Sequence, residues 1–315
     1  MTAPTLAAPA RALLEAAGCA LHFTAAFPTA ETVATSSAAV RPHAIISRQG
    51  RVEAAAMDAS PQLREIARHG VGVDDVDLDA ARARGIAVTR APGSNTQAVA
   101  EHALALLLAI RKGLRPYGAR LAAGGWRDAD RGTLDVAGLR LGLLGFGAIA
   151  QATARLALTF GMTVGAHDPQ DAGAMPEVAR HLDLCSLTRA SDVLSVHCPL
   201  TPDTRGLVDA AVLALLPVDG IVINTARGGV VDEAALLAAL DAGRLAGAGL
   251  DVFATEPPDL ADRVRNHPLV VATPHVAGVT PGTLVTMGVM AAECVVAVLT
   301  GTTMPAGRLV VAGTR

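Results

Sequence analysis

Three residues in the second half of the sequence have side chains that could bind an anion and move a proton: Arg227, Glu256 and His275. Arg227 lies in INTARGGVVDE, between an apolar run of strand length and two glycines, where a guanidinium can clamp a carboxylate or carbonyl oxygen. His275 lies in TPHVAGVT and Glu256 in LDVFATEPP. A carboxylate beside an imidazole favours the protonated ring, so such a pair can act as a general acid near neutral pH. The sequence does not show that the two touch, and each residue taken singly is more often a capping or structural group.

A glycine-rich turn is the second candidate site. Residues 141–150 read LGLLGFGAIA, and an apolar run of strand length, residues 139–144, leads into the glycines. Gly145 permits a tight turn, and Gly147 lets the backbone approach a pyrophosphate closely. Ala150 keeps the following helix close to the strand, and the helix N-terminus offers N–H groups to the anion. The pattern predicts a dinucleotide site; the alternative is a tight strand-to-helix turn without a ligand.

The residues after this turn strengthen the dinucleotide interpretation. Residues 151–160 are good helix formers, and a second short strand over residues 162–166 ends near Asp168. A carboxylate at that distance from the glycines can accept hydrogen bonds from ribose hydroxyls. Asp168 would repel a 2′-phosphate, and residues 169–171 supply no cation to receive one. We therefore expect NAD rather than NADP.

The elements that must position these residues alternate between strands and helices. Four strands are predicted at residues 193–196, 220–223, 247–250 and 270–272. Each is followed at once by polar residues, namely His197, Asn224 to Arg227, Asp251, and Thr273 to His275. Because ligands bind at the carboxyl ends of parallel strands, one sheet would gather these residues beside the glycine turn.

The first 96 residues predict a second α/β unit without a phosphate-binding turn. Helices are predicted at residues 10–17 and 78–84, and strands at 44–47, 63–67 and 86–89. The last long apolar helix, residues 281–300, comes too late to belong to the second run of strands. We expect it to return to the first domain.

After the first 96 residues, the sequence predicts a long helix over residues 97–111, with Ser94 or Asn95 available as its N-cap. Its second half is apolar nearly all round, so it must be covered on several sides. The arm after it, residues 113–133, contains Tyr117 and Trp126. We interpret helix and arm as a homodimer interface; the alternative is a helix buried within one chain.

Composition narrows the class of protein. A chain of 315 residues, 51% of them hydrophobic, is long enough for two domains. The net charge of −3 gives no indication of nucleic-acid binding. The four cysteines are scattered, which predicts free thiols, a cytoplasmic location and no metal site. The N-terminus lacks the pattern of a signal peptide, and no apolar run approaches 18 residues, so no membrane span is expected.

Several segments, in order, resemble the D-isomer-specific 2-hydroxyacid dehydrogenase family, which includes phosphoglycerate dehydrogenases and hydroxypyruvate and glyoxylate reductases. They are HGVGVDDVDLDAARARGIAV, PGSNTQAVAEHALALLLA, GLLGFGAIA, HCPLTPDTRGLV, NTARGGVVDEAAL, GLDVFATEPP and TPHVAGVT. The resemblance implies two Rossmann- or flavodoxin-like α/β domains. An NAD-binding domain of residues 97–284 would be inserted into a discontinuous substrate domain of residues 1–96 and 285–315.

The resemblance also implies roles for particular residues. His275 would be the acid/base, Glu256 its partner and Arg227 the substrate clamp, with Asp251 near the nicotinamide amide. The implied cofactor-binding residues are Gly145, Gly147, Ala148, Ile149, Asp168, Cys198, Pro199, Thr204, Thr225, Ala226, Arg227, Asp251, His275, Ala277 and Gly278. The expected substrate-binding residues are Arg48, Gly70, Val71, Gly72, Asn95, Arg227 and His275. Arg48 and Arg51 follow a predicted strand and could meet a phosphate, although a solvated surface position is an alternative of at least equal weight.

The expected activity is NAD-dependent interconversion of a D-2-hydroxy acid and its 2-keto acid, with hydroxypyruvate, glyoxylate and 3-phosphohydroxypyruvate as candidate substrates. A different class is an NAD(H)-sensing binding protein like the corepressors that resemble these enzymes; the lack of extended tails favours the enzyme. Two departures from the family pattern stand out. No first strand is visible in residues 1–9, and the D-N-I-D often found after the glycine loop is Asp74-Asp75-Val76-Asp77.

Overall fold

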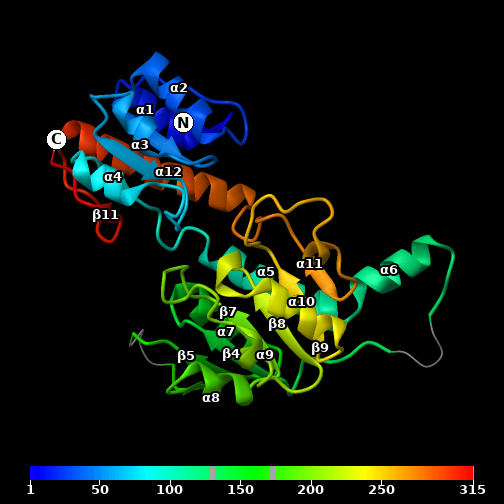
Figure 1. The fold of residues 1–315 in the computed structure, drawn as a ribbon. Helices are drawn as coiled ribbons and strands as arrows, with labels where there is room; N and C mark the ends of the chain where they lie inside the picture. The colour runs from blue at the N-terminus through cyan, green and yellow to red at the C-terminus, as the bar shows by residue number, and fades with distance from the viewer. Residues whose placement is uncertain (128–131, 171–174, 315) are drawn as a thin grey trace. The chain divides into compact units, whose positions relative to one another are not determined.

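The computed structural model describes residues 1–127, 132–170 and 175–314, and the chain divides into two compact units (Figure 1). Unit 1 is Met1–Asn95 with Val279–Arg315, and unit 2 is Thr96–Gly278. Unit 2 is therefore inserted into unit 1, and both are α/β with largely parallel sheets, which confirms the predicted fold class. The predicted return at residue 285 would cut helix α12 (Pro281–Thr300), all of which belongs to unit 1.

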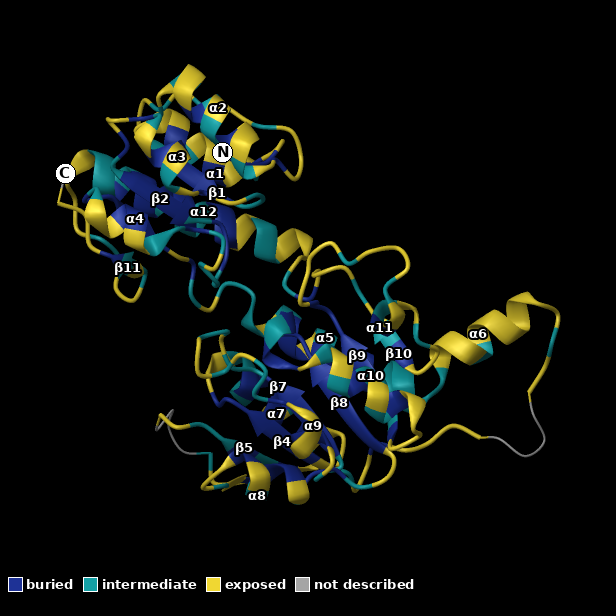
Figure 2. Cartoon of the chain, in the orientation of Figure 1, coloured by how far each residue is buried: buried dark blue, intermediate teal, exposed yellow. Residues whose placement is uncertain are grey.

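Unit 1 is built on a four-stranded sheet with the order β1-β2-β3-β11. The first three strands are parallel, and β11, which follows the long C-terminal helix, is antiparallel to β3. The elements are α1 (Ala8–Ala16), α2 (Ala30–Val40), β1 (Ala44–Ser47), α3 (Ala54–Asp58), β2 (Glu65–Arg68), α4 (Leu78–Ala83), β3 (Ala87–Thr89), α12 and β11 (Leu309–Val311). Residues from α1 and α12 form the core on one side, and residues from α2, α3 and α4 form the other. The buried strands between them are dark blue in Figure 2.

The start of the chain contains no strand, as the sequence indicates. Within residues 1–9 only Thr2 bonds to the edge strand β1, where its N–H donates to the Ile46 carbonyl at 3.0 Å; its own carbonyl accepts from the N–H of Gln49, just after the strand, at 3.1 Å. The strand β1 therefore remains at the edge of the sheet.

Helix α12 is the longest helix and a core element of unit 1. It begins at a capping box formed by Thr280 and Thr283, has Pro281 in its first turn, and ends at Gly301 in the left-handed region, φ 71°. It is the one helix among the described residues that is long and apolar enough to cross a membrane, although its sequence contains no uninterrupted apolar run of that length. Its inner face is buried, with residues such as Ala292 and Val295 packed against α1, and core helices meet the same criterion.

Strand β2 begins two residues later than predicted, at a carboxylic acid with no exposed surface, Glu65. Its Oε1 accepts a hydrogen bond from the Thr89 hydroxyl at 2.7 Å, whereas Oε2 has no partner among the described residues. Burial raises the pKa of Glu65 to about 7, and the Thr89 hydrogen bond only partly opposes this. The folded protein therefore favours the protonated acid.

We expect Glu65→Gln to stabilise the protein at pH 8 by roughly 1–3 kcal/mol and to change little near pH 4. The folded-state pKa of about 7 lies above the unfolded value, so the stability contributed by the protonated acid is complete below the unfolded pKa and is lost as the pH rises through about 7. Glutamine keeps an acceptor for Thr89 but cannot ionise. Urea unfolding of wild type, Glu65→Gln and the half-exposed control Glu15→Gln at both pH values measures the effect. Equal pH dependence in wild type and Glu65→Gln would contradict it.

Unit 2 is built on seven parallel strands with the order β10-β9-β8-β7-β4-β5-β6. Its strands are β4 (Arg140–Leu144), β5 (Thr163–His167), β6 (Val178–Arg180), β7 (Val193–Val196), β8 (Gly220–Asn224), β9 (Leu245–Leu250) and β10 (Val270–Ala272). Its helices are α5 (Thr96–Arg111), α6 (Leu114–Ala122), α7 (Ala148–Thr159), α8 (Leu184–Arg189), α9 (Ala210–Leu213), α10 (Glu233–Asp241) and α11 (Arg263–Asn266), with a 3-10 turn at Gly228–Val230. The core on one face comes from α5 and α7, and on the other from α8, α9 and α10.

The strand order reverses beside β4. From β4 the chain adds β5 and β6 on one side and then β7, β8, β9 and β10 on the other. The loop after β4 therefore lies at the point where open α/β sheets bind their ligands. Because all strands of this sheet are parallel, the loops that follow them leave the same edge.

Helix α5 is covered on its inner face by its own unit. A Cβ on Gly249 would lie 2.8 Å from Leu106, and one on Gly247 would lie 3.0 Å from Ile110, so glycines in β9 allow the helix to sit close to the sheet. The Ser94 hydroxyl donates to the Ala91 carbonyl at 2.7 Å instead of capping the helix. This face of α5 is therefore buried within a single chain, which was the alternative to a homodimer interface.

Unlike the inner face of α5, the arm that follows this helix is largely exposed. Helix α6 has no buried residue, and Leu121 and Trp126 are 60% and 73% exposed. Part of the predicted arm, residues 128–131, lies outside the described residues. Exposed apolar side chains on one helix and its extension keep the expectation of a covering partner open.

Candidate active site

The glycine turn has the geometry that the sequence predicts. Gly145 adopts φ 90°, and a Cβ there would lie 2.9 Å from the Cys198 nitrogen, so a larger residue cannot be accommodated. A Cβ on Gly147 would meet nothing within 4 Å, which leaves open space beside the turn. Helix α7 starts at Ala148, earlier than the predicted residue 151, and Ala150 is fully buried against the strand. Ala148 and Ile149 therefore form the helix N-terminus that faces this space.

Asp168 follows β5 and is bound to the same turn. Its Oδ2 accepts from the Phe146 N–H at 2.7 Å, and its Oδ1 accepts from the Gln170 N–H at 2.8 Å. The guanidinium of Arg180, at the end of β6, lies 4.9 Å from the centre of the Phe146 ring. The sequence analysis considered only residues 169–171 as a source of a cation and missed Arg180, which lies 12 residues beyond Asp168 on the next strand. Asp171 lies outside the described residues.

The loop after β7 contributes Cys198, Pro199 and Thr204. Burial raises the pKa of the Cys198 thiol to about 11, so this thiol stays protonated at neutral pH and is a poor nucleophile. Thr204 donates its hydroxyl to the Pro199 carbonyl at 2.6 Å and closes the loop. The neighbouring His197 is neutral near pH 7, because burial lowers its pKa to about 4.

The loop after β8 contributes Thr225, Ala226 and Arg227. The Thr225 hydroxyl is buried and has no hydrogen-bond partner among the described residues, as expected of a group that bonds a ligand. Arg227 donates from Nη1 to the Ala226 carbonyl at 2.7 Å. A Cβ on Gly228 would lie 1.9 Å from the Phe253 carbonyl carbon, so glycine is required next to the arginine.

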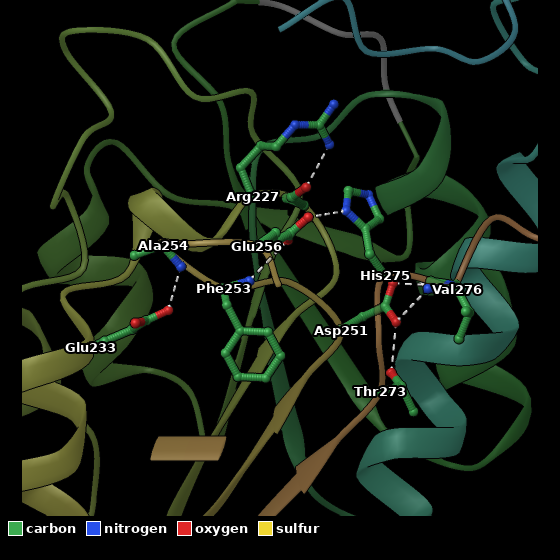
Figure 3. Close-up of polar contacts among 11 residues, drawn as sticks. Arg227, Glu233, Asp251, Phe253, Ala254, Glu256, Thr273, His275 and Val276 are labelled. Atoms are coloured by element: carbon green, nitrogen blue, oxygen red, sulfur yellow. Dashed lines mark hydrogen bonds and ion pairs between the residues drawn. The ribbon is translucent and has the colours of Figure 1, made fainter. Parts of the chain in front are cut away.

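The structure brings His275 and Glu256 into contact. His275 Nδ1 lies 2.6 Å from Glu256 Oε2, and Glu256 Oε1 accepts from the Phe253 N–H at 3.0 Å (Figure 3). Partial burial would raise the pKa of Glu256, but the His275 hydrogen bond and charge, the Phe253 N–H and the Arg227 charge outweigh it, and the pKa is lowered. The contact between the ionised carboxylate and Nδ1 fixes the orientation of the imidazole ring. Because Nδ1 faces Glu256, Nε2 is the ring atom left to exchange a proton with a ligand.

We expect Glu256→Gln to move the alkaline limb of the pH profile for ketone reduction to lower pH. Reduction requires protonated His275, and a neutral amide no longer favours the imidazolium. The measurement is kcat/KM against pH for wild type, Glu256→Gln and the matched control Glu233→Gln. The carboxylate of Glu233 accepts from the Ala254 N–H at 2.6 Å nearby and does not contact His275 (Figure 3). A Glu256→Gln profile that coincides with wild type would mean that Glu256 is structural.

Asp251, at the end of β9, holds the turn that carries His275. Its side chain is 1% exposed, and its carboxylate accepts from the Val276 and Ala277 N–H groups, both at 2.9 Å. It also accepts from the Thr273 hydroxyl at 2.6 Å, and its backbone carbonyl accepts from the His275 N–H at 2.8 Å. Asp251 therefore has a positioning role in addition to the implied place near the nicotinamide. Gly278, the last residue of unit 2, follows this turn.

The predicted substrate loop lies in unit 1. Arg68 donates from Nε to the Gly72 carbonyl at 2.9 Å and from Nη1 to the Ser47 and Arg48 carbonyls at 2.8 and 2.9 Å. It also pairs with Asp75 at 3.1 Å. Arg68, which sequence reasoning missed, thus ties the Gly70, Val71 and Gly72 loop to the end of β1, and Asp75, the departure from the family pattern, is its counter-ion.

Two further polar groups in unit 1 are buried without a partner among the described residues. They are Oδ1 of Asn95 and Nδ1 of His69, which directly precedes the loop. Burial lowers the pKa of His69 to about 4, so the ring is neutral near pH 7. Five of the expected substrate-binding residues belong to unit 1, namely Arg48, Gly70, Val71, Gly72 and Asn95. Arg227, Glu256 and His275 belong to unit 2. Within the described residues, no group of three His, Cys, Asp or Glu side chains could hold a metal ion.

Comparison with known proteins gives several similar chains. Residues 104–277 match the profile described as D-isomer specific 2-hydroxyacid dehydrogenase, NAD binding domain. D-3-phosphoglycerate dehydrogenase of Mycobacterium tuberculosis is 41% identical over 261 residues, which cover 81% of this chain and 48% of that protein. (S)-sulfolactate dehydrogenase of Chromohalobacter salexigens is 42% identical over 240 residues, covering 75% and 77%. The crystal structure of TT0316 protein from Thermus thermophilus has a TM-score of 0.86 at 36% identity, covering 98% of each chain. The chain spans about half the length of the phosphoglycerate dehydrogenases that it matches.

Proposed function

This chain belongs to the D-isomer-specific 2-hydroxyacid dehydrogenase family, and we propose that it is an NAD-dependent oxidoreductase that interconverts a small D-2-hydroxy acid and its 2-keto acid. The observation that carries the proposal is the 2.6 Å contact between His275 and Glu256 on the sheet edge that also bears the glycine turn. An imidazole paired with a carboxylate can protonate a carbonyl oxygen, and a guanidinium close by can stabilise the negative charge that develops on that oxygen.

The residues of unit 2 fit a dinucleotide. The space beside Gly147 and the N-terminus of α7 suit a pyrophosphate, Asp168 suits ribose hydroxyls, and the unpartnered Thr225 hydroxyl suits a further polar contact. When bound, the nicotinamide ring supplies or accepts the hydride. The chain's own contribution is to hold the ketone and to manage its proton.

In the reduction direction, His275 donates its Nε2 proton to the 2-keto oxygen while Glu256 holds Nδ1. Arg227 lies close enough to lower the pKa of Glu256, and its guanidinium stabilises negative charge on the carbonyl oxygen or the carboxylate of the substrate. In the oxidation direction His275 must start neutral and accept the hydroxyl proton. For unit 1, the family resemblance implies that backbone N–H groups of Gly70, Val71 and Gly72 bind the substrate carboxylate. Arg48 is a candidate for binding a distal anionic group, with a solvated surface position as the alternative.

The proposal is tested by following NADH oxidation with a panel of 2-keto acids: hydroxypyruvate, glyoxylate and 3-phosphohydroxypyruvate. We expect turnover with at least one of them, and we expect NADH to be preferred to NADPH because the Asp168 carboxylate would repel a 2′-phosphate. A preference for NADPH would contradict the cofactor assignment and would direct attention to Arg180. If the protein bound NADH but turned over none of the 2-keto acids, the proposal that it is an enzyme would be contradicted.

We also propose that the protein is a cytoplasmic homodimer. The exposed Leu121 and Trp126 on the α6 arm support a second copy as the covering partner, and the four free cysteines fit a reducing compartment. Light scattering at micromolar concentration should give about twice the 31.9 kDa chain mass. Leu121→Glu should favour the monomer, whereas Leu182→Glu, at a residue that is 96% exposed, should not. A monomeric wild type would contradict the dimer.

A further inference from the structure

Helix α5 carries one histidine in its apolar sequence, and that side chain reaches the turn that holds the proposed acid/base. His102 Nε2 lies 2.9 Å from the Thr273 hydroxyl oxygen and 3.7 Å from Asp251 Oδ1. The two partners are 171 and 149 positions away in the sequence, so the tertiary fold alone creates the cluster. His102 is one of the residues that sequence reasoning passed over.

The direction of each hydrogen bond in this cluster follows from the donors available. The Thr273 hydroxyl has a single proton, and it donates that proton to Asp251 Oδ1 at 2.6 Å. Its oxygen can therefore only accept from His102, which requires the proton of His102 to be on Nε2. The result is one ordered chain of donors, from the His102 ring through Thr273 to the Asp251 carboxylate.

At the Asp251 end of this chain of hydrogen bonds lies the backbone segment that contains His275. Asp251 accepts from the N–H groups of Val276 and Ala277, and its carbonyl accepts from the N–H of His275. His275 itself adopts φ 53°, in the left-handed region that non-glycine residues seldom occupy. Such a conformation persists where its surroundings over-determine it, and Asp251 bonds three successive N–H groups, from residue 275 to residue 277. Figure 3 shows Asp251 with Thr273 and Val276 beside His275.

We propose that His102 and Thr273 are positioning residues for the acid/base: by fixing the Asp251 carboxylate they hold His275 in the orientation in which Nδ1 meets Glu256. The proposal rests on the proposed function. It predicts that loss of either residue acts on the chemical step, because a small misplacement of a general acid reduces its efficiency steeply. Substrate and cofactor binding should change much less, because most of the proposed binding contacts, at the glycine turn, Asp168 and Arg227, do not involve Asp251.

The test uses paired variants of the full-length protein. Thr273→Val and His102→Leu remove the donors at nearly constant volume, whereas Thr273→Ser and His102→Gln keep a hydroxyl and an N–H donor at corresponding places. We expect kcat for ketone reduction to fall about 10–100-fold in Thr273→Val and about 3–10-fold in His102→Leu, with KM and the Kd of NADH within about 2-fold. The Ser and Gln variants should recover most of the rate. Thr163→Val, at an exposed threonine at the start of β5, is the control.

A double-mutant cycle separates positioning from general stability. Because both residues act through one chain of hydrogen bonds, the double variant His102→Leu/Thr273→Val should be no slower than Thr273→Val alone. Multiplicative losses, or a loss that follows only the fraction of unfolded protein in urea titrations, would overturn the proposal. So would full activity of Thr273→Val.

A second readout keeps this inference distinct from the proposed function. In NMR spectra of the protein without ligands, the His275 ring signals, assigned with His275→Gln, should shift on Thr273→Val and return in Thr273→Ser. If the wild type turned over no 2-keto acid but these shifts occurred, the proposed function would fail and the positioning role would stand. Unchanged His275 signals in Thr273→Val would overturn the positioning role whatever the activity.

Discussion

His275→Ala is expected to lower kcat for ketone reduction by about 10²–10⁴-fold while NADH binding is retained. The imidazole is the group placed to deliver the proton, and its Nδ1 contact with Glu256 at 2.6 Å orients the ring so that Nε2 is left to exchange a proton. The residues proposed to hold the dinucleotide, around Gly147 and Asp168, do not depend on this ring. Stopped-flow or steady-state reduction of the best 2-keto acid, together with NADH fluorescence titration, measures both quantities.

The half-exposed position of His275 offers a control for this experiment. Its side chain is 50% exposed, so added imidazole can enter the space that the alanine variant leaves. We expect imidazole to restore part of the rate of His275→Ala and none of the rate of a variant that lacks Arg227. A His275→Ala enzyme of near-normal rate would show that the histidine is structural and that the proposed proton transfer is wrong.

Arg227→Ala should lower kcat/KM by about 10²–10³-fold, with contributions from both a higher KM and a lower kcat. The guanidinium attracts the substrate anion in the ground state and the developing oxyanion in the transition state. Arg227→Lys keeps the charge but loses the planar two-pronged geometry, so an intermediate loss is expected. A lysine variant as active as wild type would show that only the charge matters there, and an unaffected alanine variant would remove Arg227 from the site.

The same substitution has a consequence for pH dependence. The charge of Arg227 is one of the causes that lower the pKa of Glu256. In Arg227→Ala the pKa of Glu256 should rise, so Glu256 becomes protonated at a higher pH and then holds His275 Nδ1 less firmly than the carboxylate does. We therefore expect the acidic limb of the residual activity to move to higher pH. An acidic limb in the wild-type position would mean that Arg227 and Glu256 are not electrostatically coupled.

Elements with a clear local pattern were predictable within a few residues. Strands β1, β7 and β10 and helix α12 lie where the sequence predicts them, because apolar periodicity, caps and glycine stops act over a few neighbouring residues. The sequence was less informative where a polar group is buried. Strand β2 was predicted from residue 63, but it begins at Glu65, whose carboxyl is accommodated by protonation and by Thr89, a partner on another strand.

The amino-acid sequence by itself determined the two α/β units, the glycine turn after β4, the acid after β5 and the identity of the polar residues at the strand ends. These features depend on residue type, short-range spacing and the common edge of parallel strands. Only the tertiary structure decided that His275 touches Glu256, that Arg180 covers Phe146, that Arg68 ties down the substrate loop, and that His102 reaches Thr273 and Asp251. Each of these contacts joins residues on different elements, and a hydrogen bond exists only when two side chains meet within about 3 Å at a suitable angle. Sequence spacing does not specify that geometry, since it is set by how the helices and strands pack.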